Sequence, residues 1–231
     1  MHIPRTAGTA FGRFMEQQYP GARVFDFYAG ATGNAADAVE EFRRKRHDEK
    51  QTYRLLKGHF VFGFDPEVAN FRYVTLLRRP LERLISYYFY VLADSGNYLH
   101  RLLVQRRMRL EDFLLSDIGI ELDNYQVRAI SGVGGDVPRG QIGAGHLALA
   151  QHNLQERFAA FGLTERYRDS LVEMAPLFGW NTTGMSGEPP PGRPAHSLSD
   201  ACRQEVAARN HYDLALYAFA DRLFASRLAA S

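Results

Sequence analysis

A short run of small and hydroxyl-bearing residues near the amino terminus has the composition of an anion-binding loop. Residues 4–10 read Pro-Arg-Thr-Ala-Gly-Thr-Ala and lead into residues 11–18, whose apolar spacing predicts a helix. Backbone N–H groups at the start of a helix lie at the positive end of its dipole, which favours phosphate or sulfate. Arg5 adds a fixed cation, and Thr6 and Thr9 add hydroxyl groups. These residue types favour an anion site, with an ordinary connecting loop as the alternative.

A second candidate is the pair Arg78 and Ser86. Residues 72–78 are short, apolar and β-branched, so they predict a buried parallel strand, and Pro80 suits the first position of a helix over residues 80–93. Ser86 lies about two turns into that helix. Ligands of open α/β sheets bind at the carboxyl edge of the strands, where both side chains could contact one anion. The alternative is a surface arginine and a core-facing serine.

His59 is the third candidate. It lies within residues 55–63, a short apolar stretch closed by glycine that predicts a strand leading into a loop. Histidine titrates near neutral pH without special tuning, so His59 could act as a general base. A histidine that is merely packed or hydrogen-bonded is the alternative.

Two clusters of basic residues lie in predicted helices, and a solvated helix face is the favoured interpretation of both. The basic run at residues 43–46 lies in a polar helix predicted over residues 35–50, and a solvated helix face is its favoured interpretation. The second cluster lies in a helix predicted over residues 98–115 and comprises Arg101, Arg106, Arg107 and Arg109. A solvated face is favoured here too, with an acidic or sulfated glycan as the alternative.

The elements that must position these residues alternate between strand and helix. Further helical patterns cover residues 147–160, 167–178 and 199–228. Ser199 or Asp200 is suited to cap the last helix, residues 161–164 predict a short strand or turn, and residues 182–199 predict a loop. The pattern predicts one domain over residues 1–231, of the α/β class, with a central, mostly parallel sheet flanked by helices and a helix-rich carboxyl-terminal half.

Composition excludes several classes of protein. The 231 residues are 45% hydrophobic and 23% charged, which are ordinary globular values. A net charge of +2 gives no support to nucleic-acid binding. The single Cys202 excludes a disulfide within the chain and a cysteine-rich zinc site, and the scattered histidines lack metal-ligand spacing, so no metal is expected. The sequence contains neither a membrane-length apolar run nor a signal-peptide pattern, which favours a cytoplasmic protein.

Taken together, the three candidate segments resemble the family 2 sulfotransferases, the carbohydrate-type enzymes that include heparan and dermatan 2-O-sulfotransferases. Residues 2–9, His-Ile-Pro-Arg-Thr-Ala-Gly-Thr, are similar to the family's H-I-P-K-T-A/G-G-T-S signature. Residues 77–88 are similar to L-R-D-P-x-x-R-x-x-S-x-Y, and residues 58–63 to G-H-x-x-F-G. Residues 124–128 and 161–166 resemble bacterial members. The resemblance spans nearly the whole chain, in the right order.

The resemblance implies a P-loop-like sulfotransferase fold and transfer of a sulfonate from 3′-phosphoadenosine 5′-phosphosulfate (PAPS) to a carbohydrate hydroxyl, in a polysaccharide or a membrane-associated glycolipid of a bacterium. His59 matches the proposed base, and Arg78 and Ser86 match the residues that hold the 3′-phosphate. Arg193, in the 182–199 loop, is a candidate nucleotide contact. The 5′-phosphosulfate would be held by Arg5, Thr6, Ala7, Gly8, Thr9 and Ala10. Arg5 would also neutralise charge on the leaving oxygen, with no metal required.

Three departures from the family pattern keep other functions open. Arg5 replaces the commoner lysine, Ala10 replaces a serine or threonine, and Arg79 replaces an aspartate. The Arg5 and Ala10 departures, together with the short first strand described below, motivate the alternative of a non-catalytic relative that binds nucleotide or glycan without turnover. A P-loop kinase for a small molecule is disfavoured, because the Gly-Lys-Ser/Thr ending of a Walker A loop is missing.

The strand that should deliver the anion loop is expected in the middle of the sheet. Only residues 1–3 stand where several β-branched residues are expected. Two interpretations follow: the true start lies upstream, which is favoured, or the loop is held on a frayed terminus with weakened cofactor affinity.

Overall fold

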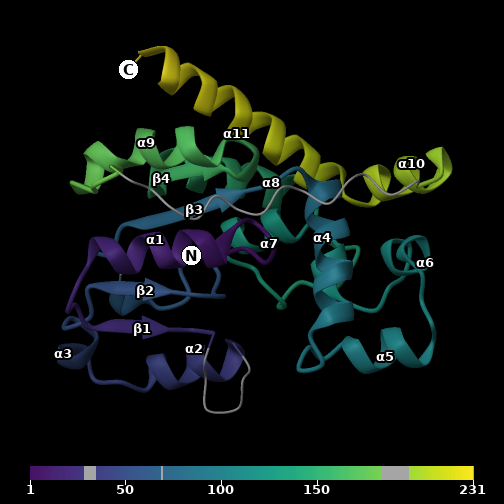
Figure 1. The fold of residues 1–231 in the computed structure, drawn as a ribbon, viewed down its shortest axis with the longest axis horizontal. Coiled ribbons are helices and arrows are strands. Elements are labelled where there is room, and N and C mark those ends of the chain that lie inside the picture. The colour runs from purple at the N-terminus through teal and green to yellow at the C-terminus, as the bar shows by residue number, and fades with distance from the viewer. Residues whose placement is uncertain (29–34, 69, 184–197, 231) are drawn as a thin grey trace.

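The structure, a computed structural model, describes residues 1–28, 35–68, 70–183 and 198–230 (Figure 1). Within these residues the strands form two parallel pairs. In the first, β1 (Val24–Asp26) pairs with β2 (Leu55–Lys57). In the second, β3 (Tyr73–Leu77) pairs with β4 (Phe158–Leu163). The α/β class and the parallel pairing predicted from the sequence are therefore confirmed. The prediction of one central sheet is not, because the strands of the described residues form two separate two-stranded sheets.

The first three residues lie between the two pairs. The amino group of Met1 donates to the carbonyl of Val74 in β3 at 2.9 Å. The N–H of His2 donates to the carbonyl of Gly58, just after β2, also at 2.9 Å. The parallel array thus runs β1, β2, residues 1–3, β3 and β4, with the anion loop leaving from its middle.

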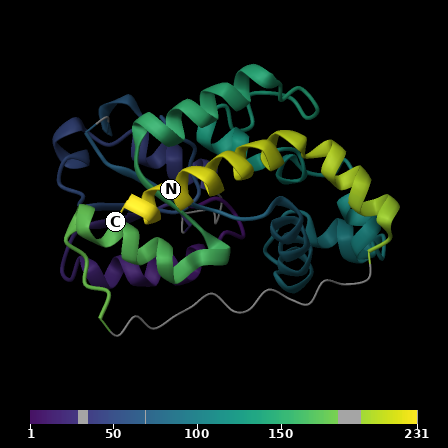
Figure 2. The ribbon, with the colours of Figure 1, turned by 90° about the horizontal axis from the view of Figure 1, so that it is seen from above.

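Helices cover both faces of this array (Figures 1 and 2). On one face, α1 (Gly8–Gln18) and α9 (Tyr167–Phe178) bury apolar residues against β3, among them Phe14, Met174 and Leu76. On the other face, a second cluster joins the strands to α7 (Tyr125–Ser131), α8 (Ala144–His152) and the long α11 (His211–Ala230). Burial on both faces explains why β3 and β4 are continuous apolar runs.

Two smaller groups of helices complete the fold. Next to β1, α2 (Ala35–Arg43) and α3 (His47–Lys50) enclose an aromatic cluster around Phe25 and Phe42. Beyond the carboxyl edge of the strands, α4 (Pro80–Ala93) packs with α5 (His100–Gln105), α6 (Leu110–Leu114) and α10 (Asp200–Arg209) (Figure 1). Their shared core includes Tyr88, Phe113 and Cys202.

Several predicted boundaries are confirmed. The helices predicted over 80–93 and 167–178 are α4 and α9, and Pro80 begins α4. The Ser199 hydroxyl accepts a hydrogen bond from the N–H of Cys202 at 3.2 Å, so Ser199 caps α10.

Other boundaries are wrong. The helix predicted over 147–160 ends at Arg157 in a π-helical turn, because Phe158 begins strand β4 and pairs with Tyr73. Three predicted helices are each divided into two. The segment 35–50 gives α2 and α3, and 98–115 gives α5 and α6, separated near Arg107, whose φ is 48°. The last helix breaks at Asn210 into α10 and α11.

Candidate anion-binding site at the carboxyl edge of the strands

The predicted site residues follow the carboxyl ends of the parallel strands and therefore lie along one edge of the array. Residues 1–3 lead into the loop at 4–7, β2 leads through Gly58 to His59, and β3 leads directly to Arg78. Carboxyl ends of parallel strands meet at the same edge of a sheet, where ligands of α/β proteins bind. The N-terminus of α1 lies at this edge as well, because α1 follows the loop.

The loop that enters α1 has a strained backbone. Arg5 and Ala7 have φ of 71° and 64°, in the left-handed region that residues other than glycine seldom occupy. Thr6 is buried, and its hydroxyl donates to the carbonyl of Ile3 at 2.8 Å, closing the turn. Ala7 is the N-cap of α1 and offers no side-chain acceptor to the first N–H groups of the helix. Strain of this kind, about 1–3 kcal/mol per residue, is typical of ligand clamps.

Arg5 links the loop to α4. Its Nε donates to the hydroxyl of Ser86 at 3.1 Å, and its guanidinium lies 4.8 Å from the ring centroid of Tyr90, one turn further along α4. Arg78 donates from Nη1 to the carbonyl of Arg5 at 3.1 Å. Arg78 and Ser86, predicted as a pair, are therefore brought together with Arg5 between them.

The position of Arg78 is fixed by a buried amide. Gln126 of α7 accepts from the N–H of Arg78 and donates to its carbonyl, both at 2.9 Å. The N–H of Arg79 donates to the carboxylate of Glu165 at 2.8 Å. Burial lowers the pKa of the Arg78 guanidinium below its usual value. A partly desolvated cation with a fixed backbone gains more from an anion than an exposed one does.

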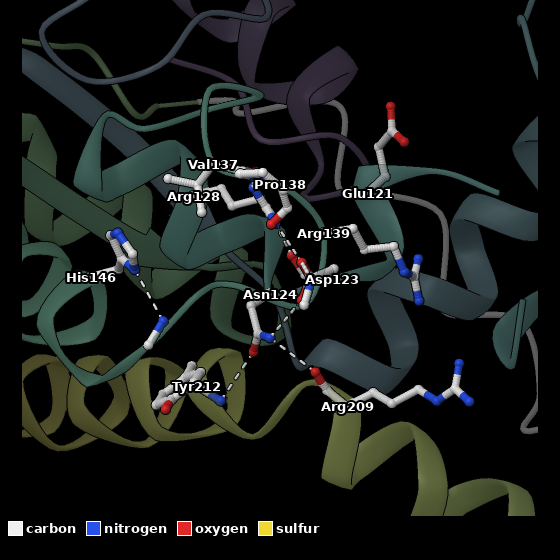
Figure 3. A network of polar contacts seen from close by, with 12 residues as sticks. Glu121, Asp123, Asn124, Arg128, Val137, Pro138, Arg139, His146, Arg209 and Tyr212 are labelled. Atoms are coloured by element: carbon white, nitrogen blue, oxygen red, sulfur yellow. Dashed lines mark hydrogen bonds and ion pairs between the residues drawn. The ribbon is translucent and has the colours of Figure 1, made fainter. Parts of the chain in front are cut away.

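A polar network holds α7 in place (Figure 3). Buried Arg128 pairs with Asp123 and donates to the carbonyls of Val137 at 2.5 Å and Pro138 at 3.0 Å. The amide of Asn124 donates to the carbonyl of Arg209 at 2.9 Å, at the end of α10. Residues 124–128 therefore stabilise the position of α7, and Gln126 connects this helix to Arg78 of the candidate site.

His59 is oriented by the main chain of the neighbouring segment. Its Nδ1 lies 2.9 Å from the carbonyl oxygen of His2. Since a carbonyl only accepts hydrogen bonds, Nδ1 carries the proton and Nε2 is the basic nitrogen. Burial lowers the pKa of His59. The imidazole is therefore neutral near neutral pH and able to accept a proton.

Sequence reasoning missed the aromatic residues that enclose His59. The ring of His2 stacks on that of His59 with centroids 4.6 Å apart, and Tyr28 presents its ring edge-on at 4.8 Å. The hydroxyl of Tyr28 is hydrogen-bonded to Nδ1 of His2. Burial lowers the pKa of His2 well below its usual range and raises that of Tyr28. All three side chains are thus neutral, and Tyr28 follows β1 with no motif that could have marked it.

A lysine that the sequence analysis did not single out ties three elements together beside this cluster. Lys57 of β2 lies 3.1 Å from the carboxylate of Glu16 in α1 and is hydrogen-bonded to Asp26 of β1. Lys57 therefore places one positive charge between the carboxylates of Glu16 and Asp26.

Gly8, the first residue of α1, is required by the ring of His2. A Cβ on Gly8 would lie 1.9 Å from Nε2 of His2, closer than any non-bonded contact allows. We expect Gly8→Ala to push α1 away from the sheet and to lower the thermal midpoint. If the loop binds adenosine 3′,5′-bisphosphate, the ligand that the sequence resemblance implies, the substitution should weaken that binding by about tenfold or more. Calorimetric titration measures the affinity, and differential scanning calorimetry measures the midpoint.

Gly12 supplies the matched control on the same helix. A Cβ there meets nothing within 4 Å, so Gly12→Ala should leave binding unchanged and raise helix stability slightly. Wild-type binding in the Gly8→Ala protein would contradict the packing described for the loop.

The remaining predicted residues divide between described and undescribed parts of the chain. Thr9 and Ala10 lie in the first turn of α1, while Arg193 lies outside the described residues. In the ranges that the structure covers, no cluster of His, Cys, Asp or Glu has the geometry of a metal site, and no helix is long and apolar enough to cross a membrane. No protein-family model matches the chain, and the search of curated proteins gave no significant match.

Proposed function

We propose that the protein is a sulfotransferase that moves a sulfonate from PAPS to a hydroxyl of a carbohydrate, either a polysaccharide or a glycolipid. One observation carries the proposal: Arg5, Arg78 and Ser86, from three separate segments, meet at the start of α1. The resemblance of residues 2–9, 58–63 and 77–88 to family 2 sulfotransferases supports it, and with it a P-loop-like sulfotransferase fold.

The donor would be held by two groups of residues. The strained loop and the first N–H groups of α1 supply donors for the 5′-phosphosulfate, and Arg78 with Ser86 supplies a cation and a hydroxyl for the 3′-phosphate. In the structure, the Arg5 side chain donates a hydrogen bond to the Ser86 hydroxyl. A phosphate that binds Ser86 would replace this hydrogen bond with its own. The Arg5 guanidinium would then be available to the oxygen that joins the sulfonate to the 5′-phosphate.

The reaction transfers one group and one proton. The acceptor oxygen forms a bond to sulfur as the bond from sulfur to the bridging phosphate oxygen breaks, and adenosine 3′,5′-bisphosphate leaves. The acceptor proton passes to Nε2 of His59, the nitrogen left basic by the bond from Nδ1 to His2. Arg5 and the N–H groups of α1 stabilise the charge that grows on the leaving oxygen.

The pH dependence of transfer follows from His59. The base must be unprotonated, and burial lowers its pKa below the ordinary value of 6.5. As pH falls, activity should therefore persist below 6.5 before the histidine is protonated. We expect the acidic limb of a kcat/KM–pH profile below pH 6.5, and a limb at 7 or above would contradict the role of a buried base.

A non-catalytic relative remains the second candidate, and one contact favours it. The Arg5 guanidinium is held by the Ser86 hydroxyl and lies over the Tyr90 ring, whereas the proposed transfer needs it at the leaving oxygen. An assay with sulfur-labelled PAPS across a panel of polysaccharides and glycolipids tests the proposal. Label transferred to a glycan supports the enzyme, whereas binding of adenosine bisphosphate without transfer to any acceptor supports the non-catalytic relative.

A further inference from the structure

The ring of His2 is in contact with both the start of α1 and His59. A Cβ on Gly8 would lie 1.9, 2.0 and 2.1 Å from Nε2, Cδ2 and Cε1 of His2. Nearly equal distances to three atoms of one ring place that point over the flat face of the imidazole, so Gly8 packs against this face and not against an edge. The ring of His59 stacks on that of His2, with centroids 4.6 Å apart and planes 25° apart. His2 is therefore a shared neighbour of the helix that follows the anion loop and of the candidate base.

Three hydrogen bonds fix the position of His2. Its N–H donates to the carbonyl of Gly58 at 2.9 Å, and its carbonyl accepts from Nδ1 of His59, also at 2.9 Å. The hydroxyl of Tyr28 is hydrogen-bonded to Nδ1 of the His2 ring. The main chain of His2 thus orients the ring of His59, while its side chain occupies space between that ring and Gly8.

The burial of His59 depends on the rings packed against it. Burial is the largest cause of its lowered pKa, and His2 and Tyr28 both place a ring within 5 Å of its own, centroid to centroid. Burial also lowers the pKa of His2 well below its usual range, so His2 adds no charge near neutral pH. The effect of the His2 ring on His59 is therefore to exclude water.

The charged groups that face His59 come from other residues. Arg5 and the amino group of Met1 lower the pKa of His59, whereas Asp26, which pairs with Lys57, raises it. A substitution at His2 removes none of these charges. A change in the pKa of His59 in such a variant therefore measures the loss of the His2 ring.

We propose that His2 is a positioning residue whose ring sets the separation between the start of α1 and His59 and keeps water from the part of the His59 ring that it covers. The inference rests on the proposed function in one respect, because His59 is the base only if the protein transfers sulfonate. A misplacement of about 1 Å can lower the rate of a reaction about 100-fold, so a spacer between the donor loop and the base matters for transfer.

Two substitutions separate a filled space from an empty one. His2→Gln keeps a planar amide that does not titrate, and His2→Ala removes the ring. The pKa of His59 is measured by NMR titration of the histidine ring protons, and its signal is the one that His59→Asn lacks. We expect this pKa to rise toward 6.5 by about half a pH unit or more in His2→Ala, and to stay within about 0.2 of the wild type in His2→Gln.

Phe14→Leu is the control for a loss of stability alone. Phe14 is buried on α1, and its ring packs edge-on against Trp180 at 5.6 Å between centroids. The substitution should lower the thermal midpoint and leave the pKa of His59 unchanged. The control therefore distinguishes a general loosening of α1 from the specific loss of the His2 ring.

The same variants have expected effects on transfer. In His2→Ala, kcat should fall by about tenfold or more, and the acidic limb of the kcat/KM–pH profile should move to higher pH together with the pKa of His59. His2→Gln should retain both within about threefold and about 0.2 pH units.

Two results would overturn the role of His2. One is an unchanged pKa of His59 in His2→Ala, and the other is an equal rise in Phe14→Leu. A wild-type protein that transfers sulfonate to no acceptor would count against the proposed function instead. The titration needs no substrate, so it would still decide whether the His2 ring shields His59.

Discussion

Replacing Arg78 with alanine is expected to weaken binding of adenosine 3′,5′-bisphosphate by at least about 100-fold. Charge-assisted hydrogen bonds contribute about 1.5–3 kcal/mol each, and a factor of ten in affinity corresponds to about 1.4 kcal/mol. Arg78 would supply such bonds to the 3′-phosphate, and it also donates to the carbonyl of Arg5. The substitution therefore removes a ligand contact and a support of the anion loop together. Calorimetric titration of the two proteins measures the effect.

Arg79 is the matched control for this substitution. Arg79 follows Arg78 directly and carries the same charge, but its side chain is exposed. Its hydrogen bond to Glu165 comes from the main-chain N–H, which an alanine retains. Arg79→Ala should leave affinity within about threefold of the wild type. Equal affinities of the wild-type and Arg78→Ala proteins would remove Arg78 from the nucleotide site, and the thermal midpoint of Arg78→Ala shows whether the protein is still folded.

Replacing His59 with alanine should lower the rate of sulfonate transfer by about 100-fold to 10,000-fold, the range typical of a lost general base. Binding of adenosine bisphosphate should change little, because the contacts described above for the His59 ring are with His2 and Tyr28 and not with Arg78 or Ser86. His59→Asn refines the test, since its amide can still donate to the carbonyl of His2 but cannot accept the acceptor's proton as a base.

His100 provides the control for an imidazole that only packs. Its Nδ1 lies 2.8 Å from the carbonyl oxygen of Val91, a contact of the same kind as that of His59 with His2, on α5 rather than at the strand edge. His100→Ala should retain transfer. Full activity in both His59 variants would exclude His59 as the base and leave the acceptor proton to another group.

The parts of the fold that could be predicted are those set by local chemistry. Pro80 cannot donate a backbone hydrogen bond and suits the first turn of α4, and the Ser199 hydroxyl caps α10. The β-branched run in β3 marks a strand by itself. Only the second half of β4 was predicted, as a short strand or turn over residues 161–164. Its start at Phe158 was assigned to the preceding helix, because an apolar run buried on both faces carries no period that separates strand from helix.

The site was predictable only as a set of separate segments. The sequence indicates that Arg5, Arg78 and Ser86 could each contact an anion, but the bond from Arg5 to Ser86 joins residues 81 positions apart. The clamp of Gln126 on Arg78 spans 48 positions. Contacts of this length depend on the fold as a whole and leave no local pattern. The close approach of His2 to Gly8 is hidden for a related reason. The two residues are six positions apart in the sequence, and the turn at Arg5 and Ala7 brings them together.

Nucleotide binding at the start of α1 is best tested by two calorimetric titrations of the wild-type protein, one with adenosine 3′,5′-bisphosphate and one with adenosine 5′-monophosphate. The two ligands differ only in the 3′-phosphate, which is assigned to Arg78 and Ser86. We expect the bisphosphate to bind with a Kd of about 10 μM or less, and the monophosphate to bind at least about 50-fold more weakly because it lacks the charge-assisted contact to the 3′-phosphate. Equal affinity for the two nucleotides, or binding of neither, would contradict the proposed nucleotide site.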